Sequence, residues 1–169
     1  MILLSAPSSV DSRAFRQALG QFASGVTVVT TVDPEGRPQG LTVSSFCSVS
    51  LEPPLVLVCV DNRSETHAGF QASRLFGVSV LAEDQLEVSQ RFARGGPEKN
   101  AFAFATGARG TPLVPGALAH LECSLHSAHE GGDHAIYVGK VLGLRVRPGR
   151  PLLYHASGYA RLAEDRPIG

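Results

Sequence analysis

The sequence lacks the features that mark several large classes of protein. Charged residues make up 18% of its 169 residues, and 15 basic side chains balance 15 acidic ones without a basic run. This balance argues against an electrostatic surface for nucleic acid. The sequence therefore predicts a small molecule or another protein as the partner, and no nucleic acid.

Paired cysteines and long apolar runs are also missing. Cys47, Cys59 and Cys123 form no C-x-x-C motif and no metal-finger spacing, which is typical of reduced thiols in a cytosolic protein. The first twelve residues have no basic region and too short an apolar run for a signal peptide. No window approaches the roughly 20 apolar residues of a membrane span. We therefore expect a cytoplasmic protein with no membrane segment.

The common nucleotide and hydrolase motifs are absent too. The sequence has no G-x-G-x-x-G after a strand, no G-x-x-x-x-G-K-[ST] and no G-x-S-x-G elbow. A nucleotide bound by this protein would need its phosphate held in another way.

The sequence does contain the pattern of one globular domain over residues 1–169, with a core of about 13–162. Helices are predicted over 11–24, 61–74 and 82–93, with a loop over 94–112 and an irregular tail from 145. Strands are predicted over 26–46 with a turn near 33–36, at 55–60 and 75–81, and in two longer segments around 121–125 and 136–144. This order has no regular βαβ alternation and predicts a mainly β, mostly antiparallel barrel with a few peripheral helices.

Two features of the strands stand out. The run LVLVCV at 55–60 is apolar on both faces, which predicts burial on both sides. Before it, hydroxyl side chains fill residues 42–50; if 42–49 is one strand, Thr42 and Ser44 face one way and Ser45 and Cys47 the other. The hydroxyls either form a solvated barrel end or surround a polar ligand, and the pattern leaves both open.

The segment DNRSETH follows the apolar strand and begins a short helix. A helix N-terminus presents free N–H groups and about half a positive charge, and Arg63, Ser64 and Thr66 would add a cation and two hydroxyls. This combination suits a phosphate monoester. In the alternative interpretation, Ser64 caps the helix and Arg63 is a solvated charge.

A metal site is a further alternative in ECSLHSAHEGGDH, which contains histidine and carboxylate side chains. Glu122 and His126, however, lie four strand residues or roughly 13 Å apart. No H-x-H or H-E-x-x-H spacing occurs, so we expect no metal.

Taken together, residues 22–70, 76–93 and 121–141 resemble the short-chain flavin reductases in the order and spacing of four motifs. This family includes the reductase components of two-component aromatic monooxygenases, such as that for 4-hydroxyphenylacetate. The resemblance covers about Phe15 to Tyr159. It implies a split β-barrel of Greek-key, FMN-binding type that forms a homodimer with the flavin near the subunit interface.

The resemblance also implies roles for particular residues. The strand that borders the flavin ring corresponds to Gly40, Leu41, Thr42, Val43, Ser44 and Ser45, with Cys47 beside it. The phosphate site corresponds to Ser64 and Thr66, with Asn62 and Arg63 adjacent. The middle loop contributes Lys99 and Phe102, the tail contributes Tyr159, and His134 of the G-D-H turn positions the nicotinamide.

The implied activity is transfer of a hydride from NADH or NADPH to FMN or FAD, with reduced flavin supplied to a separate monooxygenase. The alternative is an FMN-binding electron carrier with little NAD(P)H activity of its own. The motifs are compatible with either flavin and with either nicotinamide dinucleotide.

Overall fold

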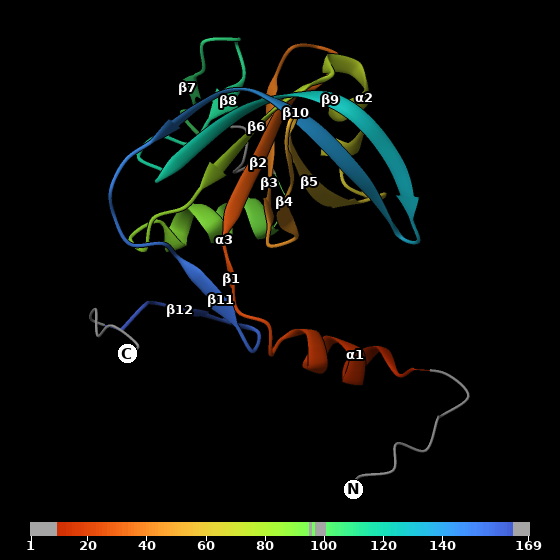
Figure 1. Cartoon of the computed structure of the whole chain (residues 1–169), viewed down its shortest axis with the longest axis vertical. Coiled ribbons are helices and arrows are strands. Elements are labelled where there is room, and N and C mark those ends of the chain that lie inside the picture. Colours follow the sequence, from red (N-terminus) through yellow and green to blue (C-terminus); the bar gives the residue numbers. More distant parts are fainter. Residues whose placement is uncertain (1–9, 95, 97–100, 164–169) are drawn as a thin grey trace, which may run out of the picture.

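The computed structural model describes residues 10–94, 96 and 101–163 and is dominated by one antiparallel sheet of seven strands (Figure 1). In space the strands run in the order β3, β2, β6, β9, β10, β5 and β4. Their bounds are β2 Thr27–Val32, β3 Pro38–Val43, β4 Phe46–Leu51, β5 Pro54–Asp61, β6 Leu75–Val80, β9 Ala119–Gly131 and β10 His134–Val146. The predicted mainly antiparallel β fold with peripheral helices is confirmed.

The seven-stranded sheet closes into a split barrel, because a link of only two residues joins its two edge strands. β3 and β4 are the two outer strands of the sheet, yet only Ser44 and Ser45 join them. Because consecutive Cα atoms are about 3.8 Å apart, the step from Val43 to Phe46 spans at most about 11 Å, so the two edges meet at that corner. The interpretation of residues 42–49 as one strand is therefore wrong: the second half pairs with β5, not with β2.

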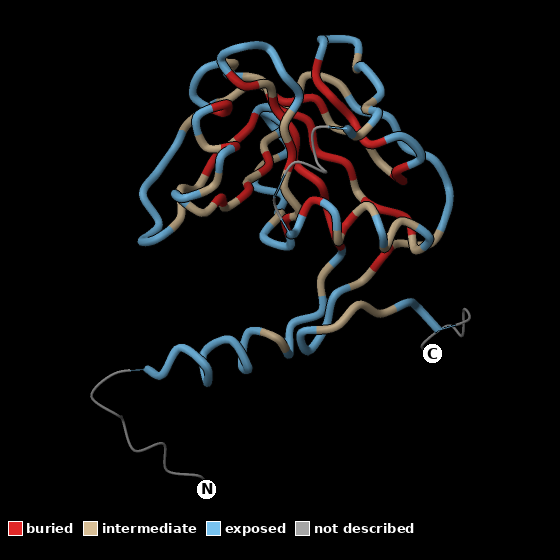
Figure 2. The backbone as a smooth tube through the Cα atoms, turned by 180° about the vertical axis from the view of Figure 1, so that it is seen from behind, coloured by how far each residue is buried: buried red, intermediate tan, exposed pale blue. Residues whose placement is uncertain are grey.

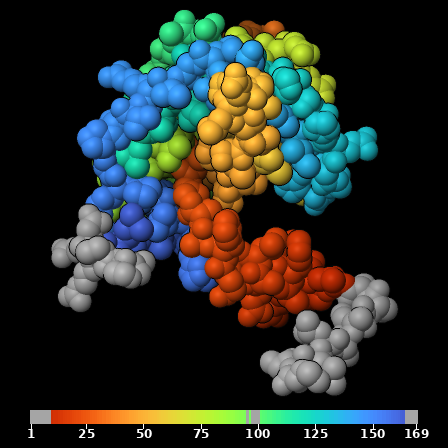
Figure 3. Space-filling view, viewed as in Figure 1, coloured from red at the N-terminus to blue at the C-terminus, as the bar shows by residue number. Residues whose placement is uncertain are grey.

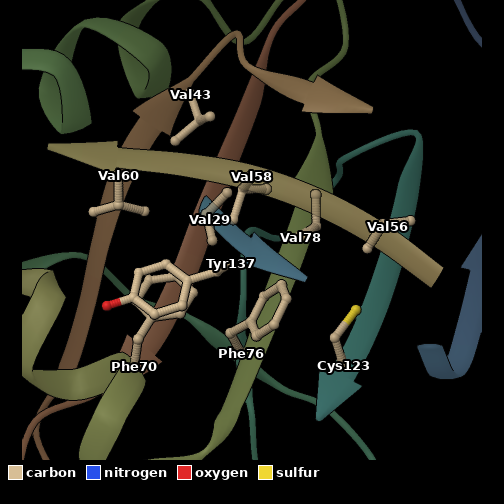
Figure 4. Packing of buried hydrophobic residues seen from close by; sticks show 10 residues of the cluster. All are labelled: Val29, Val43, Val56, Val58, Val60, Phe70, Phe76, Val78, Cys123 and Tyr137. Carbon is tan, nitrogen blue, oxygen red and sulfur yellow. The ribbon is translucent and has the colours of Figure 1, made fainter. Parts of the chain in front are cut away.

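Valines and aromatic rings fill the barrel interior (Figure 4). Tyr137 of β10 is fully buried and stacks on Phe70 with 4.5 Å between ring centroids, and Phe70 packs on Phe76 at 5.2 Å. Buried aromatic surface of this kind dominates core energetics. The whole cluster consists of Val29, Val43, Val56, Val58, Val60, Phe70, Phe76, Val78, Cys123 and Tyr137.

The apolar strand β5 is fully buried on one face only. Its inward residues Val56, Val58 and Val60 belong to the core. Its outward residues Leu55, Leu57 and Cys59 are half-buried. The prediction of burial on both sides is therefore confirmed for the inner face and met only in part on the outer face, because a barrel wall encloses the core on its inner side alone.

Two helices pack on the barrel. In α2, Thr66–Ser73, a Cβ added to Gly69 would lie 2.6 Å from Thr31 Cγ2, so the helix approaches β2 more closely than alanine allows. In α3, Leu86–Arg94, Phe92 is buried and joins a second apolar cluster. That cluster consists of Val26, Val28, Leu81, Phe92, Val114, Ala117 and Leu152.

The N-terminal helix α1, Ser12–Leu19, stands clear of the barrel, and none of its residues is buried (Figures 1, 2 and 3). Asp11 caps it by accepting a hydrogen bond from the backbone N–H of Ala14 at 2.9 Å. A small sheet connects the helix to the body through β1 Ser24–Gly25, β11 Leu153–His155 and β12 Gly158–Ala160. The tail was predicted to be irregular because strands of three residues are too short to show alternation.

A buried carboxylate holds the small hairpin of β7, Ala105–Thr106, and β8, Pro112–Leu113. Glu122 accepts hydrogen bonds from the backbone N–H groups of Ala108 and Arg109, each at 2.9 Å, and from the Thr111 hydroxyl. Burial by itself would raise the pKa of the Glu122 carboxyl, but these donors lower it below its ordinary value.

We expect Glu122 to make the free energy of unfolding depend on pH. Because its pKa is lower in the folded chain, its contribution is complete above the unfolded pKa of about 4.3 and is lost as the pH falls through the folded pKa. At pH 7 the Glu122→Gln variant should be less stable than wild type by about 1.5–3 kcal/mol. Urea unfolding between pH 3 and 7 should show this difference shrinking at low pH, and a difference independent of pH would contradict the assignment.

Candidate functional site

A cavity of about 540 Å³ opens beside the edge strand β3. Its volume falls in the range of about 300–1,000 Å³ typical of small-molecule sites. β3, the turn after β5 and the last turn of α3 form its walls. The lining residues are Gln39, Gly40, Leu41, Thr42, Asp61, Arg63, Ser64, Glu65, Thr66, Phe92, Ala93 and Arg94. Six of them, Gly40, Leu41, Thr42, Arg63, Ser64 and Thr66, are predicted site residues.

The wall formed by β3 is held against α3. The Thr42 hydroxyl donates to the backbone carbonyl of Ser89 at 2.6 Å. A Cβ added to Gly40 would lie 3.1 Å from Phe92 Cε1, so the ring packs directly on the strand backbone. β3 therefore has little freedom to move relative to α3, and the shape of this wall is set before a ligand binds.

Two hydroxyls face each other at the start of α2. Ser64 Oγ and Thr66 Oγ1 are 2.6 Å apart, and the Thr66 residue is buried. Glu65 occupies the N-cap position of α2 and makes no side-chain capping bond, so Ser64 does not cap the helix. The alternative interpretation of Ser64 as a cap is thus wrong. One of the paired hydroxyls donates to the other, which leaves one hydroxyl hydrogen for an oxygen atom in the cavity, and both can donate to a ligand that displaces their mutual bond.

Arg63 forms an ion pair with Asp61 at the same turn. Its Nη2 and Nε lie 2.8 and 3.1 Å from the two carboxylate oxygens, and its backbone N–H donates to Asp61 Oδ1 at 2.8 Å. The side-chain hydrogen bonds from Arg63, followed by the backbone one, hold the pKa of Asp61 well below its usual range. The carboxylate stays ionised, so the charge of Arg63 is already balanced within the turn.

Comparison with known proteins identifies the family of this chain. Residues 19–163 match the family described as flavin reductase like domain. The chain belongs to the flavin reductase family. The resemblance seen in the sequence motifs is thereby confirmed.

Individual members are similar over nearly the whole chain. The chain is 42% identical over 165 residues to reductase subunit HsaB of a flavin-dependent monooxygenase from Rhodococcus jostii (strain RHA1), covering 96% of this chain and 84% of that protein. It is 44% identical over 159 residues to the FMN reductase (NADH) SmoA of Agrobacterium fabrum, covering 94% and 91%. The structure of the NADH:FAD oxidoreductase SgcE6 of Streptomyces globisporus with NAD and FAD fragments superposes with a TM-score of 0.85 at 39% identity, covering 94% and 99%.

In this flavin reductase, several residues that the resemblance assigns to the flavin lie outside the cavity lining. Val43 points into the barrel core, and Ser45 bonds the backbone of Cys59 on β5. Ser44 forms the link between β3 and β4, and Cys47 lies exposed on β4. Asn62 donates to the Gly132 carbonyl at 3.3 Å and so connects the Ser64 turn with the G-D-H turn.

Phe102 and Tyr159, the two aromatic residues that the resemblance assigns to the flavin, both contact α3. Phe102 packs edge-on against Phe92 at 5.1 Å between centroids, and the Tyr159 hydroxyl lies 2.9 Å from Ser89 Oγ. Both therefore support the helix that forms one cavity wall. Lys99 lies outside the described residues.

His134 lies near the cavity but does not line it. It sits opposite Asp61 in the pairing of β10 with β5, and its Nδ1 is 2.7 Å from Asp133 Oδ1. The hydrogen bond and charge of His134 lower the pKa of Asp133. This hydrogen bond orients the imidazole, which lies on the strand next to the one that ends at the cavity.

Six lining residues were not predicted: Gln39, Asp61, Glu65, Phe92, Ala93 and Arg94. Asp61 and Glu65 stand beside motif residues, so adjacency could have suggested them. Gln39 donates to Asp33 Oδ2 at 3.3 Å, and its amide oxygen is buried with no hydrogen-bond partner among the described residues. Phe92, Ala93 and Arg94 reach the cavity from a different element, and no sequence signal marks them.

Metal binding and membrane insertion were the two further questions raised by the sequence. Within residues 10–94, 96 and 101–163, no three His, Cys, Asp or Glu side chains are grouped as a metal site would require. Within the same part of the chain, no helix has the length and apolar character needed to span a membrane.

Proposed function

We propose that this chain is a cytoplasmic NAD(P)H:flavin oxidoreductase that transfers a hydride from NADH or NADPH to FMN or FAD and supplies the reduced flavin to a separate monooxygenase. The observation that carries the proposal is the cavity in which the backbone of Gly40–Thr42 lies beside the hydroxyl pair of Ser64 and Thr66, in a flavin reductase chain. The relatives named as an NADH-dependent FMN reductase and as a monooxygenase reductase subunit support the co-substrate and the partner.

The lining residues fit the parts of a flavin. The hydroxyls of Ser64 and Thr66 suit a phosphate, and Leu41 and Phe92 offer apolar surface to a ring. β3 pairs with β2 on one side only within the described sheet, which leaves backbone groups on its other side for the polar edge of the ring. A bound flavin supplies the hydride acceptor, while the protein binds, orients and shields the reacting rings.

We place the nicotinamide on the side of His134. Asp133 holds Nδ1 of this imidazole at 2.7 Å and leaves Nε2 available to a carboxamide group. The position of His134 opposite Asp61 sets it next to the cavity wall. Its role is to position the nicotinamide, because the cofactors themselves carry the hydride transfer.

The test is NADH and NADPH oxidation by the purified protein, with and without added FMN, FAD or riboflavin, after the visible spectrum has been recorded. Turnover that depends on added flavin is the expected result, and it would rank the flavins and the nucleotides. A retained yellow chromophore that neither nucleotide reduces would overturn the proposal and favour an FMN-binding electron carrier.

We further propose that the chain forms a homodimer in which α1 packs on the second copy. Phe15 and Leu19 of α1 are 54% and 57% exposed, and Phe22, three residues after the helix ends, is 81% exposed; no residue of the helix is buried. A stripe of large apolar side chains projecting from a folded body is typical of an interaction site. The family resemblance, which places the flavin near a subunit interface, supports a second copy as its occupant.

Replacing Phe15, Leu19 and Phe22 together by serine should convert the dimer into a monomer, because the apolar surface that drives association is removed. Size-exclusion chromatography with light scattering measures the mass directly. Replacing Arg13 and Gln17 of the same helix by serine gives a control that should remain dimeric. A triple variant with the mass of wild type would contradict the role of α1.

A further inference from the structure

Two acidic and two basic side chains line the cavity, and one of each kind form an ion pair with each other. Asp61 and Arg63 are joined by two side-chain hydrogen bonds and so form a balanced pair. Glu65 and Arg94 also line the cavity, and neither makes an ion pair with another described residue. Arg94 is therefore the guanidinium whose charge is left for a ligand.

The fold fixes the position of the backbone at Arg94. It is the last residue of α3, and Phe92, two residues earlier, is buried against the backbone of Gly40. The Thr42 hydroxyl bonds the carbonyl of Ser89 in the same helix. The backbone of the final turn of α3 is thus anchored to β3, which forms the neighbouring cavity wall, so the point from which the Arg94 side chain extends is fixed.

We infer that Arg94, rather than Arg63, is the cation that binds the flavin phosphate, which rests on the proposed flavin reductase function. The hydroxyls of Ser64 and Thr66 are neutral donors, so a phosphate dianion in this cavity needs a positive charge from elsewhere. Glu65 also lines the cavity, so without Arg94 its carboxylate would repel a phosphate bound there. A guanidinium adds charge and a planar set of donors that suits phosphate oxygens.

A purely structural role for Arg94 predicts a different result. Arginine in the last turn of a helix interacts favourably with the helix dipole. If that were the whole role of Arg94, its replacement would change the stability of the protein and leave flavin affinity unaltered. Flavins with and without a phosphate separate the two explanations, because riboflavin has the same ring system as FMN and no phosphate.

The experiment measures dissociation constants for FMN and riboflavin by flavin fluorescence in wild type and in Arg94→Gln. We expect the FMN constant to rise by about 10- to 100-fold and the riboflavin constant to stay unchanged. Arg91→Gln, on the same helix and outside the cavity lining, is the control and should alter neither constant. Glu65→Gln should tighten FMN binding, and added salt should reduce the effect of Arg94.

The outcomes distinguish failure of the Arg94 assignment from failure of the proposed flavin reductase function. If wild type binds both flavins and Arg94→Gln changes neither constant, or changes both equally, the assignment of Arg94 is overturned while the flavin site stands. If wild type binds neither flavin, the proposed function and the inference fall together. An equal loss in Arg91→Gln would show a general charge effect and would also overturn the assignment.

Discussion

The Ser64→Ala/Thr66→Val double variant should bind FMN about 100-fold more weakly than wild type or worse, with riboflavin affinity unchanged. The two hydroxyl oxygens are 2.6 Å apart at the start of α2, so both can donate to one phosphate that displaces the hydrogen bond between them. A hydrogen bond to a charged group contributes about 1.5–3 kcal/mol, and the variant removes two. Titration of flavin fluorescence with FMN and riboflavin measures both affinities.

The substitutions are chosen to keep the local shape. Valine is nearly isosteric with the buried Thr66, and Ser64 does not cap α2, so the helix should remain intact. Ser127→Ala removes a hydroxyl from the exposed end of β9 and serves as the control, with no expected effect on either flavin. Equal weakening of FMN and riboflavin would mean that the ring site has been disturbed and would contradict a phosphate role.

The Gly139→Ala variant should lose about 3 kcal/mol of the free energy of unfolding or more. Gly139 is buried in β10, and a Cβ at this position would overlap Phe76 Cζ and lie 2.7 Å from Phe76 Cε1 and 3.0 Å from Cys123 Cβ. Both neighbours belong to the barrel core shown in Figure 4. Close-packed interiors accept an added methyl group only by strain.

A matched glycine lies on the same strand. A Cβ added to Gly143 would meet nothing within 4 Å, so Gly143→Ala should change stability little. Urea unfolding of the two variants compares them directly, and Phe76→Leu introduced into Gly139→Ala should restore part of the loss by making room. Equal stability of the two glycine variants would contradict the packing described for this part of the core.

Much of the fold could be predicted from local sequence because strands and helices impose short periods. The strands on either side of the turn near 33–36 correspond to β2 and β3. The predicted helix over 61–74 contains α2, and the one over 82–93 contains all of α3 except its last residue, Arg94. The alternation of polar and apolar residues also located β9 and β10. The predictions failed where the signal was not local, at the break after Val43 and in the short strands of the tail.

The residues of the candidate site also fall into those that local sequence predicts and those that it does not. Residues adjacent in sequence could be predicted together: Gly40, Leu41 and Thr42 on one strand, and the turn that carries Ser64 and Thr66. These two segments have unusual composition of their own, so motif spacing reveals them. The sequence by itself determined this half of the cavity, because each part depends on neighbouring residues.

The tertiary structure alone decided the other half. Phe92 and Arg94 join the cavity because α3 packs along β3, about 50 residues away in the chain, and no local pattern encodes that contact. The ion pair of Arg63 with Asp61 is local, two residues apart, but the sequence does not show that these two charges are the ones that meet. Composition indicated which charges the site contains, but their distances in the folded chain decide which of them remains free to bind an anion.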